Sequence, residues 1–398
     1  MSLWISYIYT FLVQFRVTRI VNILFITQIL GMRLTEFAIL ESIYAASQFA
    51  MEVPSGYLGD KVGKKITVVL GLVFSSISQL VLFVCGACSD DSIFIIIAMA
   101  FVLDGVAHAL LSGADDALIF ENLRSDALSD IYDKIRGECQ LVGAITLGVA
   151  TAIGGFLYAI HPCLPYICQA AASAIAIIPI LLCHEDRQLF SNERSALKQT
   201  LNSLYEVRTN SILVYMVIFT CLSMSTINTI FGIMPSYTES IGFSSSQNGI
   251  LFMLLSFIGG FVASKAYKLS QKSNLQLTII VAIMLNTGAI LINFFDYKLI
   301  VFVGLSFLYV VIDVIDPIAM KVFQMEIEDN VRATFLSLVS FLISAGSMIL
   351  YPILAFGVEN IGMSHMLLII AIVLTFVLLF ICAASKKRKT ENEVSEVN

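Results

Sequence analysis

Uninterrupted apolar segments about 20 residues long recur along the whole chain, and they restrict its fold more than any other feature. A helix of about this length crosses the hydrocarbon core of a bilayer. In lipid every backbone polar group needs an internal partner, so only helices and closed barrels can span the membrane. Barrel strands alternate polar and apolar residues, and these segments show no such alternation. The sequence therefore predicts an all-α polytopic membrane protein.

We expect twelve transmembrane helices. Their apolar segments lie near residues 4–30, 36–58, 66–87, 93–117, 139–160, 164–183, 211–237, 247–267, 275–295, 298–320, 332–357 and 364–384. Charged residues make up 13% of the 398 residues, which is about half the share of a typical soluble domain. This composition excludes a soluble enzyme, a secreted disulfide-linked domain and a disordered protein.

Positive charge is concentrated in alternate loops. Of the 23 Lys and Arg residues, 19 lie in the tail or in the loops after the second, fourth, sixth, eighth and tenth segments. Only Arg33 and Lys298 lie in the opposite loops, while Arg16 and Arg19 lie within the first segment. Because Lys and Arg gather on the cytoplasmic side of membrane proteins, we expect a multi-pass protein of the cell (inner or plasma) membrane with both termini in the cytoplasm.

The longest internal polar stretch separates the first six segments from the last six. It predicts an N-terminal six-helix bundle (1–183), a cytoplasmic linker (184–210), a C-terminal six-helix bundle (211–385) and a cytoplasmic tail (386–398). A short repeat supports this division. Gly56-Tyr-Leu-Gly-Asp-Lys-Val-Gly-Lys-Lys follows the second segment, and Gly260-Phe-Val-Ala-Ser-Lys-Ala-Tyr-Lys follows the eighth. Since both halves have the same orientation, the repeat is a parallel one.

The first copy of the repeat resembles the signature loop of the major facilitator superfamily. The matching positions are Gly56, Asp60, Gly63, Lys64 and Lys65. The resemblance implies the major facilitator fold, with two six-helix bundles related by a pseudo-two-fold axis along the membrane normal. It also implies a cytoplasmic gate that this loop forms near Arg332, at the start of the eleventh span. The alternative is a loop whose lysines only fix the topology.

Further strings resemble bacterial drug:proton antiporters. They are Glu52-Val-Pro-Ser-Gly56, Ser112-Gly-Ala-Asp-Asp-Ala-Leu-Ile-Phe-Glu121 and Arg332-Ala-Thr-Phe-Leu-Ser337. The antiporter pattern in the fifth span is a glycine run with a Gly-Pro pair. This chain has Gly143, Gly148, Gly154 and Gly155, with Ala150-Thr151 in place of the pair. Small residues allow helices to approach closely in lipid, so we expect helix packing at these glycines.

Ionisable residues inside the spans are the candidate proton and substrate site. Each costs about 3 kcal/mol near the bilayer centre, so this many must line an aqueous cavity or pair with one another. In the superfamily the first, fourth, seventh and tenth spans surround the central cavity. The candidates on these spans and on the second are Arg16, Arg19, Glu41, Glu52, Asp104, His108, Asn228, Asp313 and Asp316.

Roles within this set follow from residue type and spacing. Asp104 and Asp313 are the best candidates to bind a proton or a cationic substrate. His108, one turn from Asp104, either shares that proton or is a hydrogen-bonded packing residue. Asp104, His108 and Asp115 are separated by four and seven residues and would share one helix face. The two arginines of the first span either pair with acids or meet an anionic group of the substrate.

We therefore expect a secondary active transporter that exports an amphipathic drug or small metabolite in exchange for protons by alternating access. The resemblance links such efflux to multidrug and antibiotic resistance. The alternatives are a proton-coupled importer of a small metabolite and a non-transporting membrane sensor or immunity protein. The sequence has no G-x-x-x-x-G-K-[ST] loop and no metal-site spacing of His and Cys. We expect no enzyme activity, no cofactor and no nucleic-acid partner, and a monomer whose partners are substrate, protons and lipid.

Overall fold

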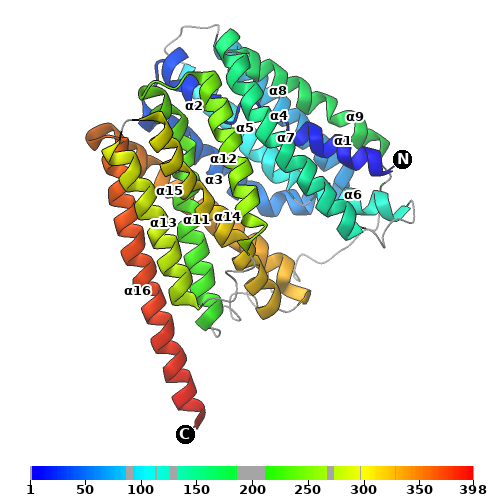
Figure 1. The fold of residues 1–398 in the computed structure, drawn as a ribbon. Helices are drawn as coiled ribbons and strands as arrows, with labels where there is room; N and C mark the ends of the chain where they lie inside the picture. The colour runs from blue at the N-terminus through cyan, green and yellow to red at the C-terminus, as the bar shows by residue number, and fades with distance from the viewer. Residues whose placement is uncertain are drawn as a thin grey trace. The chain divides into compact units, whose positions relative to one another are not determined.

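All regular structure is helical in the part of the chain that the computed structural model describes (Figure 1). These residues are 2–86, 93–112, 114–125, 132–183, 185, 211–266, 273–295, 297–327 and 329–397. By internal packing the chain forms two compact units. The first comprises residues 1–190 and 233–254, and the second comprises residues 191–232 and 255–398.

The N-terminal half contains most of the helices of the first unit. They are α1 (Ser2–Gln14), α2 (Val21–Leu24), the π-helix η1 (Phe25–Ile29), α3 (Leu34–Val62), α4 (Lys64–Cys85), α5 (Ile93–Leu111), α6 (Ala114–Ser125), α7 (Tyr132–Ile160), α8 (Leu164–Ile175) and α9 (Ile177–Leu182). Helix α4 packs against α5 and α8, and α5 also packs against α3. A buried cluster that includes Ile5, Leu72, Leu118 and Ile180 joins α1, α4, α6 and α9.

The described residues of the C-terminal half form helices of 19 to 35 residues. They are α11 (Ser211–Ser240), α12 (Ser245–Ala263), α13 (Asn274–Phe294), α14 (Lys298–Glu326), α15 (Asp329–Ile361) and α16 (Met363–Val397). In the second unit, α13 packs against α14 and along α16 (Figure 1). The division between the units falls within α11 and α12, since residues 233–254 belong to the first unit. The expected bundles, 1–183 and 211–385, therefore remain a proposal.

The twelve expected spans correspond to these helices. Ten helices of the described residues are long and apolar enough to cross a membrane, and α1 is a shorter apolar helix. Helix α3 is long enough to cross, but Glu41 and Glu52 make it less apolar. Side chains such as Met99 and Phe380 are 62% and 75% exposed, as expected for residues that face lipid.

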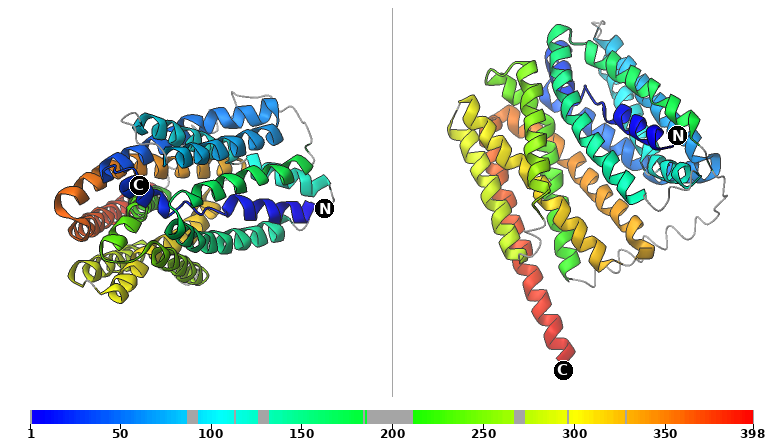
Figure 2. Two further views of the ribbon diagram at one scale, coloured as in Figure 1. Left: turned by 90° about the horizontal axis from the view of Figure 1, so that it is seen from above. Right: turned by 45° about the vertical axis from the view of Figure 1, so that its right-hand side comes forward.

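Two expected spans are built differently from the prediction. The first is not one helix over 4–30, because α1 ends at Gln14 and α2 begins only at Val21 (Figure 2, right, dark blue). The fourth is divided as well, since α5 ends at Leu111 and α6 begins at Ala114. Both breaks affect where the candidate charged residues lie.

Candidate functional site

Charged and polar side chains gather in the first unit where α3 and α5 approach each other. Gly105 of α5 permits this approach, because a Cβ there would meet the Tyr44 carbonyl oxygen and lie 2.9 Å from Ser47 Cβ. The neighbouring Asp104 lies near Glu41 of α3, and the two carboxylates interact electrostatically. Both side chains are only partly buried. The two helices thus bring two acids together inside the helix bundle.

Helix α4 supplies a hydroxyl to this pair. Gly71 of α4 lies against α5, since a Cβ there would be 2.9 Å from Leu111 Cγ and 3.1 Å from the Ala107 carbonyl oxygen. One turn further along α4, the Ser75 hydroxyl donates a long hydrogen bond of 3.5 Å to Asp104 Oδ1. Asp104 therefore has a polar partner from a second helix in addition to the acid on α3.

Arg16 provides the positive charge of the cluster. Its guanidinium acts electrostatically on Asp104, His108 and Tyr44. The rings of Tyr44 and His108 meet edge to face, with centroids 6.3 Å apart. His108 Nδ1 is buried and has no hydrogen-bond partner among the described residues. Glu41, Asp104, His108 and Arg16 form what we call the acid–arginine cluster.

Arg16 lies in the break of the first span. The Val21 and Asn22 N–H groups donate to the Thr18 carbonyl oxygen at 3.2 and 2.9 Å, which restarts the helix. On α7, Gly154 leaves room for the Val17 carbonyl group. Non-helical backbone at membrane depth is tolerated only where protein buries it or where it lines an aqueous cavity. Arg19, in the same break, is exposed.

Glu52 and Asp115 are separate from this cluster. The Ser112 hydroxyl donates to Glu52 Oε1 at 3.4 Å, and the Tyr9 hydroxyl donates to Asp115 Oδ2 at 3.3 Å. Because α5 ends at Leu111, Asp115 belongs to α6. The prediction that it shares a helix face with Asp104 and His108 was therefore wrong.

The signature loop joins α3 to α4 through Gly63, whose φ of 114° is unfavourable for residues with a side chain. Glu185, just after α9, accepts a hydrogen bond of 3.2 Å from the Lys65 N–H. The Lys65 ammonium donates to the carbonyl oxygens of Leu181 and Cys183 at 2.6 and 3.1 Å.

The other residues predicted for this gate are described only in part. The side chains of Asp60 and Arg332 lie outside the described part of the structure. A Cβ at Gly56 would meet nothing within 4 Å, and Lys64 is partly buried. Glu185 was missed by sequence reasoning, although a carboxylate directly after the sixth span was a signal for a partner of the lysine-rich loop.

The glycines of α7 lie at close contacts on two sides. A Cβ at Gly143 would be 3.2 Å from the Gln14 side chain, and one at Gly155 would be 3.1 Å from the Gly249 Cα of α12. Gly148 is buried. Elsewhere in the first unit, the Gln28 amide donates to the Glu239 carboxylate of α11, a contact that the sequence did not predict.

The candidate acids of the second unit, Asp313 and Asp316, lie on α14. Asp316 is exposed and acts electrostatically on Asp313, one turn before it. Asp313 Oδ2 is buried and has no hydrogen-bond partner in the described part of the chain. Asn228 of α11, the polar residue predicted for the seventh span, is exposed.

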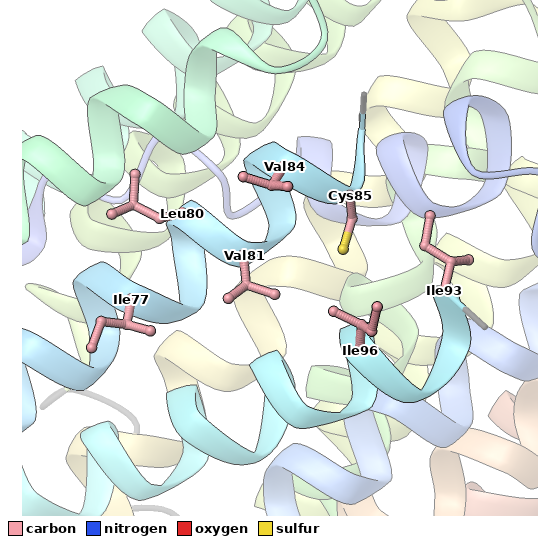
Figure 3. Close-up of a pocket in the computed structure, with 7 residues that line it drawn as sticks. All are labelled: Ile77, Leu80, Val81, Val84, Cys85, Ile93 and Ile96. Carbon is pink, nitrogen blue, oxygen red and sulfur yellow. The ribbon is translucent and has the colours of Figure 1, made fainter. Parts of the chain in front are cut away.

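A separate apolar groove of about 400 Å³ lies between α4 and α5 (Figure 3). Its lining residues are Ile77, Leu80, Val81, Val84, Cys85, Ile93 and Ile96. Leu80 and Val84 are 43% and 55% exposed, and none of the lining side chains carries a charge. The groove therefore suits hydrocarbon and is not part of the acid–arginine cluster.

Ionisable groups inside a bundle of membrane-spanning helices mark substrate or ion pathways, which places the chain in the class of membrane transporters. The family model of the Major Facilitator Superfamily matches residues 3–329. The chain belongs to this superfamily of secondary transporters, which confirms the resemblance and the fold predicted from the sequence.

Solved structures with the same fold share little sequence with this chain. The nucleoside transporter NupG has a TM-score of 0.77 at 15% identity, covering 96% of this chain and 98% of that one. A D-xylose-proton symporter has a TM-score of 0.77 at 11% identity, covering 96% of each chain. An inward-facing bacterial homologue of the human lysosomal transporter Spinster has a TM-score of 0.76 at 13% identity, covering 97% of this chain and 96% of that one. No curated protein sequence matches the chain.

Proposed function

We propose that this secondary transporter is coupled to protons and that the acid–arginine cluster carries the coupled proton. The observation that carries the proposal is the placement of Asp104 within the helix bundle, where it interacts with a second acid, Glu41, and with Arg16. We further propose that it lies in the cell membrane with both termini in the cytoplasm, because of the basic residues in alternate loops. We also propose that it is a monomer.

The charges of the acid–arginine cluster are suited to the exchange of a proton for a cationic substrate. With His108 neutral, two carboxylates and one guanidinium leave one excess negative charge when both acids are ionised. Like charges that lie close together disfavour ionisation of both acids. A proton on either acid removes the excess charge, and so does a cationic group of the substrate. Because both would neutralise the same charge, they compete for it, as antiport requires.

Export of an amphipathic drug or small metabolite is the direction that we favour, because the strings beginning at Glu52, Ser112 and Arg332 resemble drug:proton antiporters. Proton-coupled import of a small metabolite is the second candidate. It is supported by the similarity of the fold to that of a D-xylose-proton symporter, and it would use the same acids.

The test compares the wild type with Asp104→Asn and with Glu359→Gln, a matched loss of one exposed carboxylate. A panel of drugs in an efflux-deficient host identifies exported compounds, and counterflow with a panel of metabolites identifies imported ones. Flux of the selected compound is then measured in proteoliposomes with and without a pH gradient.

We expect Asp104→Asn to abolish gradient-driven flux while leaving downhill exchange, because the amide keeps the shape of the carboxyl group but cannot exchange a proton. Glu359→Gln should transport like the wild type. Full gradient-driven transport by Asp104→Asn would refute the assignment of the coupled proton to this cluster.

A further inference from the structure

The second unit contains a carboxyl site of its own, built where α12 meets α14. Asp313 projects from α14 against Gly259 of α12. A side chain at Gly259 would overlap the carboxyl group, since its Cβ would contact Asp313 Oδ2 and lie 2.7 Å from Cγ. The absence of a side chain at this single position is therefore what admits the carboxyl group.

Aromatic side chains enclose the same position. Tyr309 lies one turn before Asp313 on α14. A Cβ at Gly259 would be 3.1 Å from the Cε1 atom of Tyr309. Its hydroxyl is 3.2 Å from the Ser256 hydroxyl of α12. The ring of Phe231 from α11 meets the Tyr309 ring edge to face, with centroids 5.0 Å apart. The carboxyl group and the Tyr309 ring thus both lie against Gly259.

The electrostatics of the site favour a neutral carboxyl group. Asp313 Oδ2 is buried without a hydrogen-bond partner in the described part of the chain, and burying an unpaired ionised carboxylate is far more costly than burying a neutral one. Asp316, on the same helix, adds a negative charge that acts on it. The side chains that face the site from α12 and α11, Ser256 and Phe231, carry no charge to offset this. Helix α13, which packs against α14, has no charged residue, and α15 has charged residues only near its two ends.

We propose that Asp313 is a second proton-binding site, held protonated in this conformation, and that Gly259 is the positioning residue that creates its pocket. The proposal extends the proposed function, because it gives the second unit a proton carrier that is independent of Asp104. This proposal concerns proton binding by Asp313 and not flux. It can therefore be refuted while coupling through Asp104 is upheld, and coupling through Asp104 can be refuted while proton binding by Asp313 is upheld.

The chain offers a matched pair of variants for the test. Gly259 and Gly260 are adjacent in α12, but a Cβ at Gly260 would meet nothing within 4 Å. The full-length protein in lipid nanodiscs is titrated with acid and base, and infrared difference spectra record the C=O stretch of protonated carboxyl groups. The variants are Asp313→Asn, Gly259→Ala and Gly260→Ala.

We expect a carboxyl band in the wild type that is lost in Asp313→Asn, shifted in frequency and in titration midpoint in Gly259→Ala, and unchanged in Gly260→Ala. An unchanged spectrum in Asp313→Asn would refute protonation of this residue. Identical spectra for the two glycine variants would refute the role of Gly259.

The test remains decisive if Gly259→Ala does not fold. The double variant Gly259→Ala/Asp313→Ala removes the carboxyl group that the new methyl group displaces, so we expect it to fold and to elute as a monodisperse protein. If the double variant also fails to fold while Gly260→Ala folds, the methyl group clashes with something other than Asp313. That result would overturn the assignment of Gly259.

Discussion

Replacing Arg16 by alanine should destabilise the protein, because the acid–arginine cluster then loses its positive charge. Glu41 and Asp104 would remain as two neighbouring carboxylates without a counter-charge. Breaking a fully buried ion pair costs about 3–5 kcal/mol. Arg16 acts on Asp104 through its charge and is only partly buried, so the loss is smaller than for a direct buried pair, and we expect about 1–3 kcal/mol.

The measurement is the free energy of unfolding in mixed micelles titrated with dodecyl sulfate. Arg19→Ala is the control, since Arg19 lies in the same break but is exposed, and it should change this free energy by no more than about 0.5 kcal/mol. Arg16→Ala/Asp104→Asn should be more stable than the sum of the single losses predicts, by about 1 kcal/mol, because contacting charges are not additive. Equal, mild losses for both arginine variants and an additive double variant would refute the charge balance that we describe.

Three further predictions concern topology and the signature loop. A cysteine introduced at Lys198 should react with impermeant reagents only from the cytoplasm and one at Asn360 only from outside; labelling of both from one side would contradict the twelve-span topology. Asp60→Asn should reduce transport strongly without affecting insertion, whereas Ser264→Ala should have little effect, and equal mild effects would leave the loop as a topology determinant. Gly63→Ala should lower the free energy of unfolding by about 1–3 kcal/mol, because a φ of 114° with a ψ of 143° is a conformation that favours glycine, and Glu185 Oε1 would lie 2.9 Å from the new Cβ; wild-type stability would contradict the strain argument.

The fold was predictable from sequence because lipid imposes a local rule on each segment. Apolar length alone located both ends of α13 and the start of α16 to within a few residues, whereas α16 continues to Val397, beyond the predicted end of the span at residue 384. The break in the first span was not predictable in this way. It depends on Gly154, which lies on α7 and receives the Val17 carbonyl group, and hydropathy says nothing about such a distant contact.

The candidate site could be predicted as a set of residue types but not as an arrangement. Charge inside apolar segments was enough to propose Asp104 and Asp313 as candidates, because lipid makes such residues costly. Their partners could not be identified, since the helices that supply Ser75 and Gly259 approach through glycine contacts that leave no periodic signal. A glycine on a helix that packs against an acid-bearing helix is the sequence feature that would have marked Gly259 as a candidate.

The broken first span has a consequence for biosynthesis. Helix α1 has only 13 residues, which is shorter than the roughly 20 that make a stable transmembrane segment on their own. The arginines that follow it add a further penalty for insertion. The backbone of Val17 is covered by Gly154, 137 residues later in the sequence. At a translation rate of about 5–20 residues per second, the nascent chain waits roughly 7–27 s for this partner. During that interval the insertion machinery, and not the protein, has to shield the first span, so variants at Gly154 should lower membrane insertion of the N-terminus before they alter any transport step.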